Sequence, residues 1–157
     1  MTDQDFMNEA LAEATLAYDA GEYPVGAIVV RDQEIIARGH NAQTTSCDPT
    51  AHAEVVAIRS ACRMLGQRKL TDCILYTTLA PCPMCEGAII EADLDKVVFG
   101  GSLHGWIRDI KFDRTAIDLV GPIDERGRTL FEKRLQEKGR DEVFRYETER
   151  QPASNKP

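Results

Sequence analysis

The chain has 157 residues, enough for one domain with a buried core, and a formal net charge of −7 at pH 7. No stretch approaches the roughly 20 apolar residues that span a bilayer, and the acidic balance disfavours a polyanionic partner such as nucleic acid. The five cysteines are an odd number, which disfavours a disulfide framework, and the first residues lack the basic flank of a signal peptide. We therefore expect a cytoplasmic protein with no membrane contact.

Hydrophobic periodicity predicts the first elements. Apolar residues at helical spacing over 6–18, ended by Gly21, predict a helix. Two strands follow, over 25–30 and 34–38, joined by a polar turn. An Asp-Pro-Thr sequence at 48–50 then supplies helix-start chemistry.

The next helix is expected over 51–65, with His52 and Glu54 in its first turn. An apolar, β-branched run at 73–79 predicts a buried strand. Pro-Cys-Pro at 81–83 predicts the start of a helix that runs to about residue 92.

A second buried strand at 97–99 and a charged surface helix at 130–139 complete the prediction. Because strands alternate with helices after residue 73, we expect partly parallel pairing. The fold class is therefore α/β, a three-layer α/β/α sandwich with a central mixed sheet. We expect a single domain over 1–150 and a disordered tail at 151–157.

Three side chains have the pattern of a zinc site. His52 is followed by Cys82 and Cys85, and one His with two Cys leaves the fourth tetrahedral position open, as in catalytic zinc sites. Both segments lie at predicted helix starts, where side chains lean beyond the helix end and the dipole favours thiolate. A lone Cys-x-x-Cys also occurs in redox sites and zinc fingers, but no second metal-binding pair follows here. We predict one Zn²⁺ per chain.

Glu54, two residues after the histidine, is the predicted catalytic acid and base. Zinc lowers the pKa of bound water toward about 7. A carboxylate beside this water can take its proton, pass it to a ring nitrogen and then protonate a departing amine. Burial in an apolar pocket would raise the pKa of this carboxyl. The pattern predicts an enzyme, a zinc-dependent aminohydrolase that acts on a cyclic amidine.

The His-x-Glu and Pro-Cys-x-x-Cys segments form the zinc deaminase signature, and the chain resembles the cytidine deaminase superfamily over most of residues 5–120. Residues 44–54 and 73–85 are similar to bacterial guanine deaminases. Residues 38–41 and 76–82 are equally similar to fungal-type cytosine deaminases.

This resemblance implies a zinc-bound homodimer with an α/β/α sandwich. It implies that Asn41 hydrogen-bonds the base, that the Ala80 carbonyl accepts from the leaving amine and that the Cys82 amide steadies an oxygen.

Four further residues are candidates for substrate binding. His104 and Trp106 lie in a glycine-bracketed loop just past a predicted strand, where an aromatic ring can stack on a flat base. The alternative for Trp106 is packing at a dimer interface or on the core. Ala53 and Asp113 complete the predicted substrate-binding set.

Three functions remain open from the sequence. The leading hypothesis is deamination of a free nucleobase or related aminoheterocycle, with guanine ahead of cytosine and isocytosine. A tRNA adenosine-to-inosine deaminase is the second, because bacterial enzymes of that class share the Asp-Pro-Thr-Ala-His-Ala-Glu segment at 48–54. It would need a basic face and salt-dependent binding. The third is a zinc-binding module without catalysis.

Overall fold

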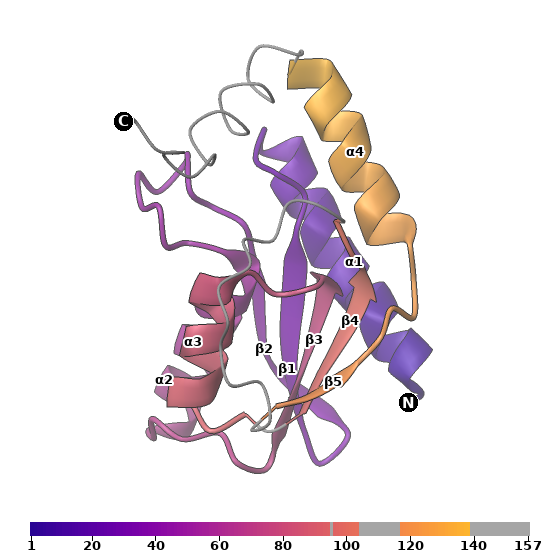
Figure 1. The fold of residues 1–157 in the computed structure, drawn as a ribbon. Coiled ribbons are helices and arrows are strands. Elements are labelled where there is room, and N and C mark those ends of the chain that lie inside the picture. The colour runs from indigo at the N-terminus through magenta and orange to yellow at the C-terminus, as the bar shows by residue number, and fades with distance from the viewer. Residues whose placement is uncertain (95, 104–116, 139–157) are drawn as a thin grey trace, which may run out of the picture.

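The computed structural model describes residues 1–94, 96–103 and 117–138 (Figure 1). Its elements, in chain order, are α1 (Asp3–Asp19), β1 (Gly26–Arg31), β2 (Glu34–His40), α2 (Ala53–Leu65), β3 (Cys73–Leu79), α3 (Pro83–Glu91), β4 (Lys96–Gly101), β5 (Asp118–Val120) and α4 (Arg126–Lys138). The predicted tail at 151–157 lies outside the described residues. None of the helices in the described ranges has the length and apolar character of a membrane span.

The strands form one mixed sheet in the order β2-β1-β3-β4-β5. β1 pairs antiparallel with β2 and β3, whereas β3, β4 and β5 run parallel. The unit β3–α3–β4 is the parallel crossover that the alternation of strand and helix predicted. α2 and α3 cover one face of the sheet, and α1 and α4 cover the other (Figure 1). The predicted α/β/α sandwich is confirmed.

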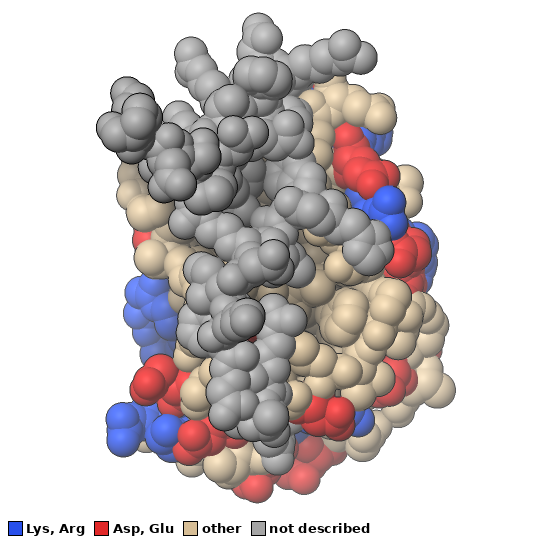
Figure 2. Space-filling model, in the orientation of Figure 1, with Lys and Arg blue, Asp and Glu red and all other residues tan. Residues whose placement is uncertain are grey.

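Charged side chains of both signs are mixed along α4. Arg128 pairs with Glu132 over 2.8 Å, and the Arg134 guanidinium lies 4.0 Å from the centroid of the Tyr18 ring, which holds α4 on α1. Figure 2 shows red and blue side chains alternating along the edge that α4 occupies. Alternating charge of this kind is typical of a solvated helix face.

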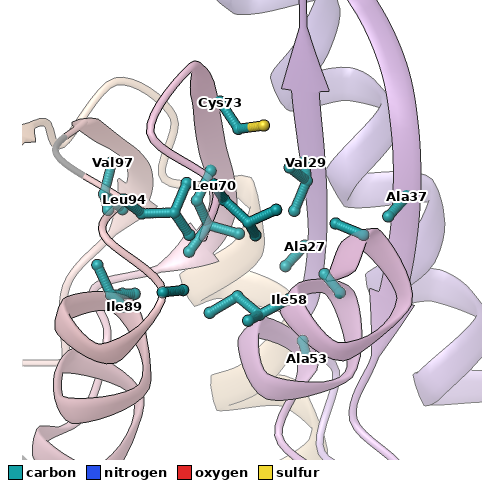
Figure 3. Packing of buried hydrophobic residues seen from close by; sticks show 14 of the residues in the cluster. Ala27, Val29, Ala37, Ala53, Ile58, Leu70, Cys73, Ile89, Leu94 and Val97 are labelled. Atoms are coloured by element: carbon teal, nitrogen blue, oxygen red, sulfur yellow. The ribbon is translucent and has the colours of Figure 1, made fainter. Parts of the chain in front are cut away.

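The strands alternate their side chains between two hydrophobic clusters. Ala27 and Val29 of β1 face α2, together with Ile58 of that helix (Figure 3). Ile28 and Val30 belong to the cluster on the opposite face, with α1. A period of two is what a strand covered on both faces requires, so nearly every β1 side chain is apolar.

The largest differences from the sequence-based expectation are at α4 and β5. α4 begins at Arg126, four residues early, because the Asp124 carboxylate accepts from the Arg126 backbone N–H over 3.0 Å and from its guanidinium. The edge strand β5 was not predicted, because three residues are too few to establish a period.

A glycine in β2 sets the position of α2. A Cβ at Gly39 would lie 2.5 Å from the Ala57 nitrogen and 2.6 Å from the Ala53 carbonyl oxygen. Only glycine therefore allows the first turns of α2 to lie this close to the sheet. This contact fixes the helix end from which the predicted metal ligand and acid project.

Candidate metal centre and active site

The structure brings together the three side chains predicted to bind zinc. The His52 Nδ1 lies 3.6 Å from the Cys82 Sγ and 3.5 Å from the Cys85 Sγ. The two sulfurs are 3.5 Å apart. Among the described residues, no fourth His, Cys, Asp or Glu joins this group.

These separations fit a tetrahedral zinc ion. Zn–S bonds of about 2.3 Å and Zn–N bonds of about 2.0–2.1 Å place sulfur about 3.6 Å from nitrogen and two sulfurs about 3.8 Å apart. The sulfur–nitrogen distances match, and the sulfur–sulfur distance is slightly short. One imidazole and two thiols are also a donor set that zinc prefers, so the residues present fit one zinc ion with one position left for a further ligand.

Two of the ligands are helix N-cap residues. His52 immediately precedes α2 and Cys82 immediately precedes α3; both have extended backbones and neither side chain caps its helix. The prediction that His52 lies inside the first turn is thus corrected by one position, because its ψ of 151° is extended rather than helical. Both side chains project beyond the helix ends, where the Cys82 Sγ lies 3.6 Å from the His52 Nδ1.

The thiols of Cys82 and Cys85 differ in acidity. The neighbouring Cys85 thiol and His52 lower the pKa of Cys82 to about 4 against the opposing effect of burial. The same contact with Cys82, together with burial, raises the pKa of Cys85. The pair therefore carries one thiolate readily, and a metal cation would favour the second.

Glu54 lies in the first turn of α2 and is only 3% exposed. Burial raises its pKa above the ordinary value, although nearby His52 opposes the shift. A carboxyl group with a raised pKa can both accept and return a proton near neutral pH. The sequence predicted a buried carboxyl with a raised pKa in this turn, and Glu54 has both properties; its catalytic role stays a prediction.

A closed loop links the predicted base-binding residue to the metal ligand. Asn41 follows β2, and its backbone N–H donates to the Val25 carbonyl over 3.0 Å. The Ala42 N–H then donates to the Ala51 carbonyl over 3.0 Å, which brings the two ends of the loop together. Asn41 and His52 are the residues directly before and after the two that share this hydrogen bond, so the closed loop begins beside one and ends beside the other.

Ala53 and Ala80, two further predicted substrate-binding residues, lie in α2 and in the segment before Cys82. The Ala53 side chain is fully buried in the core under α2 (Figure 3), which leaves only its backbone for the predicted role. The Ala80 N–H donates to the Gly101 carbonyl over 2.9 Å, which anchors the segment before Cys82. The roles of Ala53 and Ala80 stay predictions.

The remaining three predictions, His104, Trp106 and Asp113, lie outside the described residues. Sequence reasoning did not single out two polar residues near the loop. Glu22 accepts from the Thr45 backbone N–H, and Gln43 donates to the Pro49 carbonyl. Both bonds stabilise the loop, and Glu22 lies 23 residues before Thr45 in the sequence. The only available signals were an acidic residue just before an apolar strand and a glutamine two residues after Asn41.

Comparison with known proteins identifies the family. Residues 1–101 match the cytidine and deoxycytidylate deaminase zinc-binding region. This match covers more than half of the chain and includes both segments that carry the metal ligands.

Two curated relatives and one solved structure extend this match. Guanine deaminase from Bacillus subtilis (strain 168) is 44% identical over 140 residues, which cover 87% of this chain and 89% of the relative. tRNA-specific adenosine deaminase from the same strain is 40% identical over 132 residues, or 78% and 82% of the two chains. The X-ray structure of guanine deaminase from Bacillus subtilis matches with a TM-score of 0.63 and 49% identity, covering 65% of this chain and 66% of that chain.

Sequence, fold and donor geometry agree. The chain therefore belongs to the cytidine and deoxycytidylate deaminase family and is a zinc-dependent hydrolytic deaminase, with His52, Cys82 and Cys85 positioned to bind one metal ion.

Proposed function

We propose that this deaminase acts on a free nucleobase or a closely related aminoheterocycle, with guanine as the first candidate and cytosine and isocytosine next. The observation that carries the proposal is the net charge of −7. An enzyme that grips a tRNA stem must neutralise several phosphates, whereas a neutral base needs no such surface. The guanine deaminase relative, 44% identical over 140 residues, supports guanine in particular.

In this proposal Glu54 carries the protons. Its carboxylate takes a proton from the attacking water and delivers it to a ring nitrogen, and a second proton from the same oxygen then leaves with the amine. The sum is base–NH₂ plus water giving base=O plus ammonia. Burial of Glu54 at 3% exposure keeps bulk water away from these transfers.

The other residues bind and orient. A zinc ion held by the three ligands supplies the Lewis acidity that makes water nucleophilic near neutral pH. Asn41 hydrogen-bonds the base, and the Ala80 carbonyl accepts from the departing amine. The Cys82 backbone N–H steadies the oxygen.

A substrate panel tests this proposal. Ammonia release by the zinc-loaded protein would be measured with guanine, cytosine, isocytosine, adenine, their nucleosides and an adenosine-wobble tRNA stem-loop. Turnover of one free base by the wild type, and its loss in Glu54→Gln, is the expected result. Turnover of the stem-loop alone, or of none of these compounds, would contradict it.

A tRNA adenosine deaminase is the second candidate, because the Bacillus subtilis tRNA-specific enzyme is 40% identical over 132 residues. The two candidates differ in their response to salt. Binding to phosphates weakens steeply as salt is raised, whereas KM for an uncharged base hardly changes. Measuring KM between about 50 and 200 mM salt therefore separates them on whichever substrate is turned over.

We also propose a homodimer. Met64 of α2 and Met84 of α3 are large apolar side chains that are 67% and 37% exposed, and both helices lie on the same layer (Figure 1). Covering them would remove apolar surface from water. Light scattering coupled to gel filtration should give twice the chain mass of 17.5 kDa, and Met84→Lys should shift it toward the monomer. A wild-type monomer would rule the dimer out.

A further inference from the structure

The side-chain amides of Asn41 and Gln43 form a chain of hydrogen bonds within the loop that leads to His52. The Asn41 Nδ2 donates to the Gln43 Oε1 over 3.3 Å, and the Gln43 Nε2 donates to the Pro49 carbonyl over 3.0 Å. Pro49 lies on the returning side of the same loop. The Gln43 side chain therefore links Asn41, at the start of the loop, to Pro49, near its end.

The chemistry of these groups fixes their orientation. A carbonyl oxygen only accepts hydrogen bonds, so the end of Gln43 that meets Pro49 must be its NH₂. The Gln43 Oε1 is then the atom turned toward Asn41, and it can be met only by a donor. A flipped Asn41 amide would set oxygen against oxygen, so its Nδ2 must face Gln43.

The Asn41 amide is consequently held in one orientation. Asn41 follows β2 and is 3% exposed, and its backbone N–H donates to the Val25 carbonyl. Within the described ranges, no hydrogen-bond donor reaches its Oδ1. One Nδ2 hydrogen is committed to Gln43, which fixes the plane of the amide and with it the direction of Oδ1 and of the second Nδ2 hydrogen.

We propose that Gln43 is a positioning residue, which holds the Asn41 amide with its Oδ1 available to accept an N–H of the substrate. This inference rests on the proposed function and deepens it, because it selects a base that presents an N–H donor to Asn41. Guanine, cytosine and isocytosine all carry such groups on ring and exocyclic nitrogens. Gln43 itself does not touch the substrate in this scheme.

A spectroscopic measurement tests the orientation without any turnover. The chain has three asparagines, Asn8, Asn41 and Asn155, so ¹⁵N-asparagine labelling of the zinc-loaded protein gives a simple side-chain amide spectrum. Asn41→Asp assigns the Asn41 pair. We expect one Asn41 Nδ2 proton to exchange slowly with solvent in the wild type.

Two substitutions separate positioning from mere loop closure. Gln43→Leu removes the acceptor and should abolish the slow exchange, whereas Gln43→Glu keeps an acceptor oxygen and should retain it while losing the bond to Pro49. Gln67→Leu is the matched control, because Gln67 also donates to a backbone carbonyl, that of Lys69, over 2.7 Å, but beyond the C-terminal end of α2. Gln67→Leu should leave the exchange rate of the Asn41 Nδ2 protons unchanged.

Steady-state kinetics with guanine gives the functional readout. Gln43→Leu should raise KM about tenfold, the equivalent of one neutral hydrogen bond, with kcat unchanged, because a bond made equally in the ground and transition states affects binding alone. Gln43→Glu should keep KM near the wild-type value.

Three outcomes would overturn the inference: an unchanged Asn41 amide in Gln43→Leu, an unchanged KM in that variant, or an equal rise of KM in both Gln43 variants. If the wild type does not turn guanine over, the proposed substrate fails, and the amide spectrum still decides how Gln43 and Asn41 are related.

Discussion

The carboxylate of Glu22 accepts a hydrogen bond from the Thr45 backbone N–H over 2.6 Å, although Glu22 is only 1% exposed. Burial raises the pKa of Glu22, but hydrogen bonds from Thr45 and Thr44 outweigh it and lower the pKa below its ordinary value. A buried carboxylate thus ties the middle of the loop between Asn41 and His52 to the chain just before β1. Two polar side chains thus hold the loop: Glu22 accepts from Thr45, and Gln43 donates to the Pro49 carbonyl.

Glu22→Gln should loosen this loop. The neutral amide keeps the shape of the side chain but loses the charge that strengthens the bond to Thr45, so unfolding free energy should fall by about 1–3 kcal/mol. Amide exchange at Thr44 and Thr45 should speed up. The exposed Glu34→Gln is the control and should leave both quantities unchanged, while equal behaviour of the two variants would show that Glu22 has no anchoring role.

Gly39→Ala should displace α2. The added Cβ would meet the Ala57 nitrogen at 2.5 Å, and overpacking of this kind costs about 1–3 kcal/mol. Because α2 carries His52 at its start, zinc affinity should fall together with the melting temperature. Gly87→Ala is the matched change, since a Cβ there meets nothing within 4 Å and alanine favours helix. Equal melting temperatures for the two variants would contradict the packing that Gly39 permits.

Cys82→Ala should remove the metal. With one of three protein ligands gone, zinc content measured by elemental analysis should fall well below one ion per chain, and the melting temperature should fall with it. Cys47→Ala changes an exposed free thiol in the loop and should keep its zinc. Stoichiometric zinc in Cys82→Ala would exclude that residue as a ligand.

The start of α4 should make stability depend on acid pH. The Arg126 guanidinium holds the pKa of Asp124 at about 2, below its ordinary value of 3.8. Because the folded state binds the proton less readily than the unfolded state, this stabilisation is complete above about pH 4 and is lost as the pH falls through about 2.

The variant Asp124→Asn isolates this contribution. Arg126 is 62% exposed, so the variant should lose only up to about 1 kcal/mol of unfolding free energy at neutral pH. Urea unfolding at about pH 7 and about pH 2 should show that the difference between variant and wild type shrinks in acid. A difference that grows in acid would contradict the assigned pairing.

Local chemistry made most of the metal centre predictable. His52, Cys82 and Cys85 were identified because a fixed ligand spacing beside helix-start residues is a local property of the chain. The β3–α3–β4 crossover, which the alternation of strand and helix indicated, places the two cysteines at the start of α3, and His52 meets them because α2 packs beside α3.

The rest depends on long-range contacts. Glu22 and Thr45 are 23 residues apart, so no local pattern links the carboxylate to the loop it holds. The three residues of β5 become a strand only because β4 offers them an open edge. The position of α2 likewise depends on a missing side chain at Gly39, a close approach that appears only once the helix is packed on the sheet.

Substitution of Glu54 tests the proposed chemistry most directly. Ammonia release, bound zinc and melting temperature would be measured on Glu54→Gln and on the exposed control Glu91→Gln, with the base that the wild type turns over best. We predict that Glu54→Gln keeps one zinc ion per chain and a folded structure while kcat falls by about 10²–10⁴. Full activity in Glu54→Gln, or loss of its zinc, would show that Glu54 is not the proton carrier.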